Sequence, residues 1–214
     1  ERQSQLLADA GHELKTPRTR LRTNIELLMM ASKNPSDTIT PDDIADLEHD
    51  VMSQLEELTN LVTDLVDLAR EDSQHSVVEP IDLGEILDGV IDRVRRRRLD
   101  IKFTFNLIDW YLMGDQRGLS RAFLNVLDNA AKWSPENGTV TMTMQQIDDD
   151  RDEITVDDEG PGIPADEREL VFERFYRSVE SRAMPGSGLG LAIVKQVMES
   201  HGGSVRGEES PRGG

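Results

Sequence analysis

The chain has 214 residues and a formal net charge of −18, from 42 acidic and 24 basic side chains. Apolar residues make up 36% of it and aromatic residues 4%, whereas 31% is charged, which favours solvated helices over an all-β sandwich. The negative charge argues against direct binding to nucleic acid or to an anionic membrane. The lack of Cys excludes disulfides and cysteine nucleophiles, and no run of about 18 apolar residues is present to span a membrane.

Residues 1–70 carry a heptad pattern that predicts two long amphipathic helices. A break at residues 34–36 separates them, and Thr40-Pro41 followed by two acids is typical of a helix start. The prediction is a helical hairpin, and pairing of two hairpins into a dimeric four-helix bundle would cover its apolar stripe. The two apolar series are Leu7, Leu14, Leu21 and Leu28, and Ile44, Val51, Leu58 and Leu65.

Residues 71–80 are polar and end in Pro80, which predicts a linker. Residues 81–214 then alternate helical and strand patterns, so the second region is predicted to be an α+β domain. The fold class expected for the whole chain is therefore α+β. The expected helices are 82–98, 116–133 and 188–200, and the expected strands are 101–107, 139–147 and 153–157.

The first helix contains the sequence Gly-His-Glu-Leu-Lys-Thr-Pro at residues 11–17. His12 is predicted on the outer face of the helix, and Thr16 lies one turn further along the same face. An imidazole beside the carboxylate of Glu13 can be held neutral, with one nitrogen free as a nucleophile. From spacing alone, a solvent-facing helical His is the simpler alternative.

Asn125 and Asn129 are four residues apart, so both lie on one face of the expected helix over 116–133. Their amide oxygens are suitable ligands for Mg²⁺ beside phosphate groups. Lys132 follows on nearly the same face and could meet a phosphate as a point charge. Trp133 could stack on a base or simply fill the core. A solvated helix face remains the alternative for the Asn pair.

An Asp-Glu-Gly-Pro-Gly turn follows the last expected strand. Gly160 and Gly162 flank a proline, which indicates a tight turn that would present the carboxylate of Asp158 to an exocyclic amine. An ordinary acidic turn is the alternative. Further along, Arg177 ends an aromatic-rich segment and is a candidate phosphate ligand.

The segment Gly186-Ser-Gly188-Leu-Gly190 enters the last expected helix. Backbone N–H groups of such a loop can bind phosphate at a helix start. The pattern is weak by itself, and no dinucleotide-binding unit or Walker motif surrounds it.

These motifs together resemble the ATP-binding domain of the histidine kinase, gyrase, Hsp90 and MutL superfamily. With the His-Glu-Leu-Lys-Thr-Pro box, nearly the whole chain resembles the cytoplasmic core of a bacterial two-component sensor histidine kinase, most similar to actinobacterial MprB-type kinases. The resemblance implies a dimerisation and phosphotransfer hairpin over 1–70, the linker 71–80, and a catalytic α/β-sandwich domain over 81–214.

The resemblance also implies roles for the residues of the first helix. His12 would accept the γ-phosphate of ATP, with Glu13 as the general base. Thr16 would serve phosphatase activity toward the phosphorylated response regulator.

The remaining implied roles concern the nucleotide. Asn129 would be the Mg²⁺ ligand, supported by Asn125, and Lys132 would contact phosphate. Trp133 would line the adenine pocket and Asp158 would bind the adenine amino group. The segment 177–186 would be a mobile lid. The other implied contacts are Gly160 and Gly162 in the adenine pocket, Arg177 near the γ-phosphate, and Gly186, Gly188 and Gly190 in the lid and phosphate loop.

Three features depart from the family pattern. Arg18 stands where the family usually has Leu, and the heptad pattern puts it on the apolar seam between Leu14 and Leu21, where a buried unpaired guanidinium is costly. It could pair with an acid across the dimer. Gly11 lowers helix propensity. Ser204–Glu208 could form the first strand of a terminal pair, but no apolar partner follows, so either the last strand lies beyond this chain or the sheet edge is left open.

The predicted function is a homodimeric kinase core that autophosphorylates on His12 with Mg-ATP and transfers the phosphoryl group to an Asp of a response regulator, which it also dephosphorylates. It is expected to be the cytoplasmic portion of a membrane sensor, reaching the membrane only through segments outside this chain. A catalytically impaired, nucleotide-binding dimerisation scaffold is the alternative. A gyrase- or Hsp90-type ATPase is disfavoured by the His box.

Overall fold

The computed structural model describes residues 2–33, 40–71, 77–148, 151–179, 181, 184 and 186–210. The side chains of residues 2–9, 12, 13, 16, 32, 33, 67 and 69–71 lie outside this description. The chain divides into two compact units, one of residues 1–74 with 179–187 and one of residues 75–178 with 188–214. The predicted break at residues 34–36 also lies outside the described residues.

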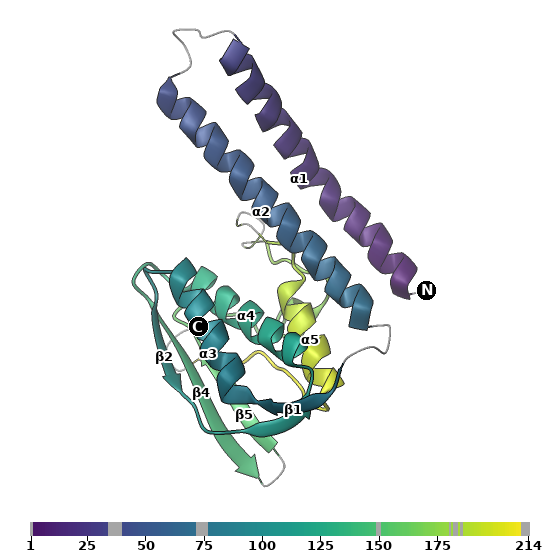
Figure 1. Ribbon diagram of the computed structural model, residues 1–214, viewed down its shortest axis with the longest axis vertical. Coiled ribbons are helices and arrows are strands. Elements are labelled where there is room, and N and C mark those ends of the chain that lie inside the picture. Colours follow the sequence, from purple (N-terminus) through teal and green to yellow (C-terminus); the bar gives the residue numbers. More distant parts are fainter. Residues whose placement is uncertain are drawn as a thin grey trace. The chain divides into compact units, whose positions relative to one another are not determined.

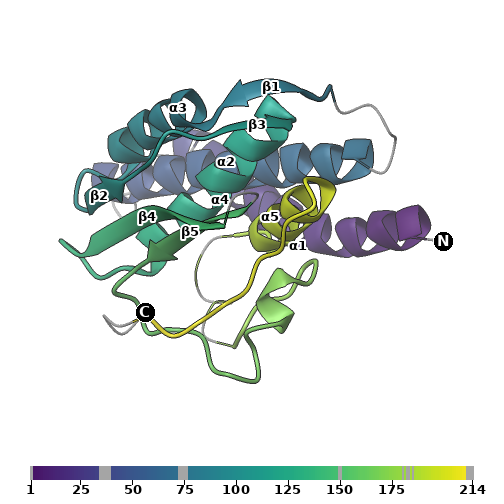
Figure 2. The same ribbon diagram turned by 90° about the horizontal axis from the view of Figure 1, so that it is seen from below.

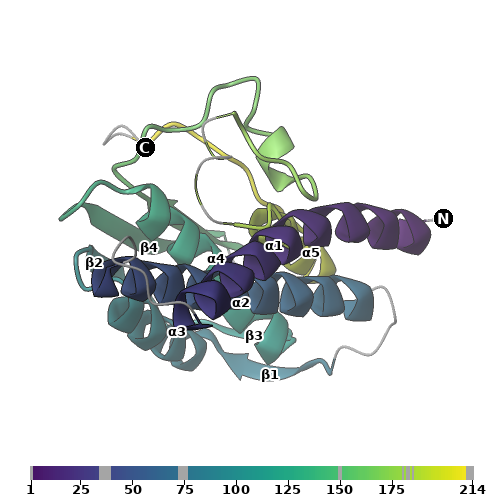
Figure 3. The ribbon, with the colours of Figure 1, turned by 90° about the horizontal axis from the view of Figure 1, so that it is seen from above.

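The first unit is built on two long helices, α1 (Arg2–Lys33) and α2 (Pro41–Glu71). They lie side by side and run in opposite directions, as Figures 1 and 3 show. The helical hairpin predicted from the heptads is therefore confirmed. The face of α1 that α2 covers includes Ala10 and Ala31, which are buried, and Leu14, Leu21 and Leu28, which are half-buried.

The position of Arg18 in this hairpin differs from the prediction. Arg18 is exposed and lies outside the face on which α1 packs against α2, so its guanidinium is not buried within the hairpin. The helix also continues unbroken through Pro17. The seven-residue series through Gly11, Arg18 and Ile25 thus forms a second, uncovered stripe of α1 rather than part of its inner face.

The start of α2 is fixed by a reciprocal cap. The backbone N–H and the hydroxyl of Thr40 both donate to Asp43 Oδ2, at 2.8 and 2.7 Å, and the Asp43 N–H donates to Thr40 Oγ1 at 3.2 Å. These bonds lower the pKa of the Asp43 carboxyl. The predicted helix start at Thr40-Pro41 is therefore confirmed.

The second unit contains a mixed three-stranded sheet and a separate strand pair. The sheet has the order β2 (Lys102–Asn106), β4 (Thr139–Asp148) and β5 (Arg151–Asp157), with β2 and β4 parallel and β4 and β5 antiparallel. In register, Phe103 lies opposite Val140, and Met142 lies opposite Val156. All three strands follow the prediction from sequence.

Three helices cover one face of this sheet, as Figures 1 and 2 show. They are α3 (Leu83–Arg97), α4 (Gln116–Trp133) and α5 (Gly190–Ser200), and α4 packs between the other two. Asp82 and Asp115 cap α3 and α4 through their side chains. The core between the layers is closed by fully buried residues: Leu87, Val90, Val94, Leu127, Val140, Met142, Leu189 and Ile193.

The two-stranded sheet was not predicted. It pairs β1 (Glu79–Asp82) with β3 (Tyr111–Gly114) in antiparallel register. The first of these strands overlaps the predicted linker 71–80, whose first residue, Glu71, ends α2. The linker is therefore shorter than predicted at both ends, because Glu71 belongs to α2 and Pro80 belongs to an edge strand.

The segment after α5 also differs from the prediction. Ser204–Glu208 forms no strand, although Arg206 pairs with Glu153 on β5 at 2.7 Å and also with Glu208. Before it, His201 ties the end of α5 to the start of α4, because its Nε2 accepts the backbone N–H of Asp115 at 2.9 Å. A short 3₁₀ turn, η1 (Leu170–Phe172), completes the described elements. None of the described helices has the length and apolar character required to cross a bilayer.

Candidate functional site

The first group of predicted site residues lies on α1. His12, Glu13 and Thr16 are helical, but the surroundings of their side chains lie outside the described residues. Their spacing on one continuous helix keeps His12 and Thr16 one turn apart on the same face. The structure thus retains the predicted backbone arrangement of the box.

The second group of predicted site residues lies in the second unit. The first of them is Asn125 on α4. Its side chain lies against Gly190, the first residue of α5: a Cβ added to Gly190 would be 3.6 Å from Asn125 Cγ. The Nδ2 of Asn125 is buried and has no hydrogen-bond partner among the described residues. A buried donor without an acceptor is costly, so this amide is set up for an acceptor supplied by a ligand.

The Asp158 turn packs against the end of the same helix. The Gly160 N–H donates to Asp158 Oδ1 at 2.8 Å. A Cβ at Gly160 would be 2.8 Å from that oxygen and 3.0 Å from the carbonyl oxygen of Trp133, so only glycine fits. Burial raises the pKa of the Asp158 carboxyl, while the Gly160 bond opposes this shift and the charge of Asp157 adds to it. Asp158, Gly160 and Trp133 therefore form one compact corner.

The third contact joins the aromatic-rich segment to the glycine loop. Gly188 has a φ of +69°, and a Cβ there would be 2.9 Å from the Tyr176 carbonyl oxygen and 3.1 Å from Arg177 Cγ. The Phe175 N–H donates to the Gly188 carbonyl at 2.9 Å, with Phe175 itself at a φ of 63°. Arg177 is thereby held directly beside the loop that enters α5.

The remaining predicted residues are placed as follows. Lys132 Nζ lies 5.6 Å from the centre of the Trp133 ring. Asn129 lies on α4, half-buried, and Gly162 has the left-handed φ of 75° expected in the turn. Gly186, with a φ of 146°, groups with the helical unit, where its N–H donates to Glu57 Oε1 at 3.1 Å.

Two side chains that position these segments were not assigned from the sequence. Glu159 accepts the Thr139 N–H at 3.1 Å and so fixes the Asp158 turn to the start of β4. Glu173 accepts from Lys195 Nζ at 3.0 Å and ties the aromatic-rich segment to α5. Both glutamates lie inside motifs that the sequence analysis had already singled out. Their charge was the signal that could have identified them.

The arrangement suits a nucleotide with a metal ion held partly by phosphate. No group of three or more His, Asp or Glu side chains in the described part of the chain could hold a metal by itself. Amide oxygens of an Asn pair with phosphate oxygens give the all-oxygen set that Mg²⁺ prefers. The unpaired Asn125 amide, the carboxylate of Asp158 and the side-chain-free approach at Gly190 all fit a triphosphate nucleotide.

Comparison with known proteins agrees with this geometry. Residues 2–74 match the His Kinase A (phospho-acceptor) domain, and residues 114–214 match the histidine kinase-, DNA gyrase B- and HSP90-like ATPase. A solved structure titled mycobacterial sensor histidine kinase MprB is 57% identical, with a TM-score of 0.57, and the match covers 61% of this chain and 84% of that one. The chain belongs to the sensor histidine kinase family.

Two further relatives extend the comparison. The signal transduction histidine-protein kinase/phosphatase MprB of Mycolicibacterium smegmatis is 56% identical over all 214 residues, which are 44% of its length. The ATP-binding domain of PrrB from Mycobacterium tuberculosis is 31% identical with a TM-score of 0.53, over 64% of this chain and 90% of that domain. This histidine kinase chain therefore spans less than half the length of that curated relative. Family membership implies the use of ATP.

Proposed function

We propose that this chain is the kinase core of a two-component sensor, which autophosphorylates on His12 with Mg-ATP. The observation that carries the proposal is the unpaired, buried Asn125 amide beside the glycine-rich start of α5, in a chain that also carries the His box. The division into a hairpin, a linker and a catalytic domain belongs to the proposal, with the linker between the end of α2 at Glu71 and the start of β1 at Glu79.

Nucleotide binding is assigned to the second unit. Asp158 accepts from the exocyclic amine of adenine, in the corner that it forms with Gly160 and Trp133. Asn125 donates its free amide to a phosphate oxygen, and Arg177 and Lys132 offset phosphate charge. Asn129 and Asn125 would hold Mg²⁺, which would neutralise triphosphate charge. Gly162 shapes the adenine corner, and Gly186, Gly188 and Gly190 let the backbone approach the phosphates.

Phosphoryl transfer is assigned to the α1 box. An imidazole nitrogen of His12 forms a bond to the γ-phosphorus while the bond to the bridging oxygen breaks, and ADP leaves with that electron pair. Glu13 takes the imidazole proton. Such a reaction depends on positioning and charge neutralisation more than on further covalent chemistry, in agreement with the few groups assigned to it.

The partners follow from the family and the hairpin. A second copy covers the exposed helix stripe, and the phosphoryl group passes to an Asp of a response regulator receiver domain. Thr16, one turn from His12, serves the hydrolysis of that phospho-Asp. Segments outside this chain connect the core to a membrane.

A nucleotide-binding scaffold without transfer is the second candidate. The feature that favours it is Arg18, an exposed side chain six residues after His12 at a position where the family usually has Leu. The two candidates differ in whether a phosphoprotein forms.

The test is incubation with Mg-ATP followed by assay for acid-labile, alkali-stable phosphoprotein. His12→Gln should abolish the label, whereas His49→Gln, which removes an exposed His of α2, should retain it. Loss in both variants, or label that persists in His12→Gln, would contradict the assignment of the acceptor. Nucleotide binding without any label would favour the scaffold.

A further inference from the structure

Each helix of the hairpin carries a second stripe at heptad spacing that no described part of the chain covers. Its apolar members are between 39% and 63% exposed, in a hairpin whose inner face is already paired. We name these the α1 stripe and the α2 stripe. The α1 stripe is Arg18, Arg22, Ile25 and Met29, and the α2 stripe is Met52, Leu55, Thr59, Val62 and Val66.

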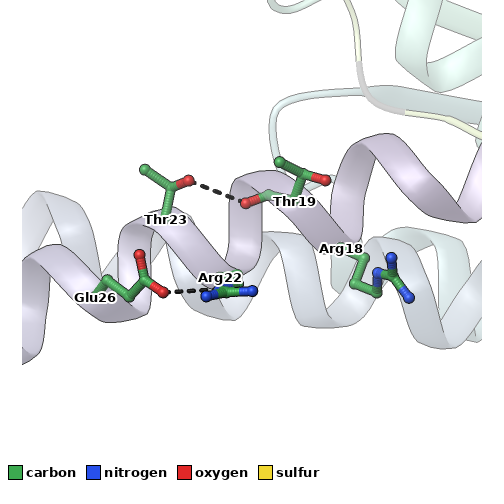
Figure 4. A pocket seen from close by; sticks show the side chains of 5 residues that line it. All are labelled: Arg18, Thr19, Arg22, Thr23 and Glu26. Carbon is green, nitrogen blue, oxygen red and sulfur yellow. Dashed lines mark hydrogen bonds and ion pairs between the residues drawn. The ribbon is translucent and has the colours of Figure 1, made fainter.

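The α1 stripe is interrupted by a basic recess of about 600 Å³. In Figure 4, Arg22 pairs with Glu26 at 2.7 Å, and Thr23 donates to the Thr19 carbonyl at 3.1 Å. Arg18, in the same recess, makes no hydrogen bond or ion pair with any described residue. The recess therefore holds an exposed cation, Arg18, whose charge no described residue balances.

A carboxylate of matching position lies on α2. Arg18 is 15 residues before Lys33 at the end of α1, and Glu56 is 15 residues after Pro41 at the start of α2. At 1.5 Å per residue, both lie about 22 Å from the connected ends of the antiparallel helices. Glu56 is exposed and, among the described residues, unpaired, and it flanks the α2 stripe one turn from Met52.

We propose that the α1 recess seats α2 of a second copy, and that Arg18 pairs with Glu56 of the partner subunit. This proposal rests on the dimer of the proposed function and assigns the residues that select its partner. A two-fold axis along the bundle puts α1 of one protomer beside α2 of the other at the same level, and every contact occurs twice. The stem of Arg18 covers apolar stripe residues while its guanidinium reaches the carboxylate.

The pair gives selectivity more than affinity. A flanking ion pair contributes little to stability in water, but a like charge in its place is repulsive. A hairpin that places an acidic residue opposite Glu56 would be repelled, so kinases with an acid at the position of Arg18 are the poorest partners. The Arg that departs from the family pattern thus marks self-recognition.

The test uses two charge-reversed full chains, Arg18→Glu and Glu56→Arg, each analysed by sedimentation alone and after mixing. Each alone places two like-charge pairs in its homodimer, so its dimer Kd should rise by roughly tenfold or more. In the mixture both pairs are restored with opposite polarity. Native mass spectrometry should then find heterodimers well above the statistical half of all dimers.

The matched controls are Arg20→Glu and Asp46→Arg, the same charge changes at exposed positions away from the two stripes. They should dimerise as the wild type does, and circular dichroism should show that all variants keep their helices. Unchanged homodimers of Arg18→Glu, or random mixing, would overturn the pairing while leaving the proposed function intact. A wild type that stays monomeric would overturn both the dimer and the pairing.

Discussion

The hairpin and the nucleotide unit solve the burial of apolar surface in different ways. The sheet and three helices of the nucleotide unit close a core in which Leu87, Val90, Leu127 and Met142 are fully buried. The hairpin instead leaves Met52 and Val62, at heptad spacing on α2, substantially exposed. The nucleotide unit therefore encloses its own core, whereas the hairpin keeps an apolar face that no described residue covers.

The difference separates two kinds of function. A closed core can hold the Asp158 corner and the Asn125 amide in fixed positions, as a nucleotide site requires. An open helical face instead suits a region that has to meet a second copy and a response regulator. We infer that substitutions in the nucleotide unit act on folding and binding, and those on the hairpin stripe act on assembly.

The largest contrast is expected from truncating one Leu in each unit. Leu87→Ala removes a side chain that is 0% exposed and should destabilise the nucleotide unit by about 2–5 kcal/mol. Leu55→Ala, at a position that is 42% exposed, should leave that unit unchanged and weaken the dimer. Both tryptophans, Trp110 and Trp133, lie in the nucleotide unit, so fluorescence-detected urea unfolding reports on it alone. Equal losses of stability of the nucleotide unit in the two variants would contradict this difference between the units.

A methyl group at Gly160 is the next strongest perturbation. Gly160→Ala puts a Cβ 2.8 Å from Asp158 Oδ1 and 3.0 Å from the Trp133 carbonyl, so the adenine corner has to shift. Nucleotide affinity should fall by at least about tenfold, measured by calorimetry with a non-hydrolysable ATP analogue. Gly89→Ala, where nothing lies within 4 Å of the added Cβ, is the control and should bind normally.

The protonation of Asp158 gives a smaller, graded effect. Burial raises the pKa of this carboxyl, so the folded state favours its protonated form. Asp158 therefore contributes to the stability of the folded unit at a pH below its pKa in the unfolded chain. That contribution is lost as pH rises through its pKa in the folded state. Nucleotide binding has the opposite sign, because the adenine amine favours the ionised oxygen. Affinity should therefore fall as pH decreases toward the raised pKa of Asp158. Asp158→Asn should bind weakly with a flat profile. A wild-type profile equally flat would refute the assignment.

The smallest effects come from two exposed helix glycines with free space around them. Gly89→Ala in α3 should stabilise the nucleotide unit by about 0.5–1 kcal/mol, because alanine loses less backbone entropy. Gly11→Ala in α1 should stabilise the hairpin similarly and leave the tryptophan transition unmoved. Ellipticity at the helix band and fluorescence, followed together, distinguish the two. Coupled shifts in both would show that the units do not unfold separately.

Much of the fold follows from local sequence patterns. The heptads defined the hairpin, Thr40 and Asp43 mark the start of α2, and α4 occupies the helix predicted over 116–133. The α+β class and the three strands of the main sheet were also predictable, since strict alternation or β-branched runs identify them. Within the site, Asp158, Gly160 and Trp133 meet as the motifs indicated.

Other features depend on long-range contacts that no local pattern contains. The strand Glu79–Asp82 is short and includes Pro80, and it forms only because Tyr111–Gly114 lies beside it. The Gly186 N–H donates to Glu57 Oε1 on α2, a contact between residues 129 positions apart in the chain. Arg18 was misplaced because two heptad seams share α1, and only the packing of α2 shows which one is covered.

We expect the phosphoryl acceptor on α1 and the nucleotide site of the second unit to be separable, and two variants measured by two methods test this most directly. His12→Gln should bind the ATP analogue with wild-type affinity in calorimetry yet form no acid-labile phosphoprotein. Asn129→Ala should bind Mg-nucleotide weakly and also remain unlabelled, although His12 is intact. If His12→Gln lost nucleotide affinity, or Asn129→Ala were labelled as the wild type is, the division of labour between the hairpin and the nucleotide unit would be contradicted.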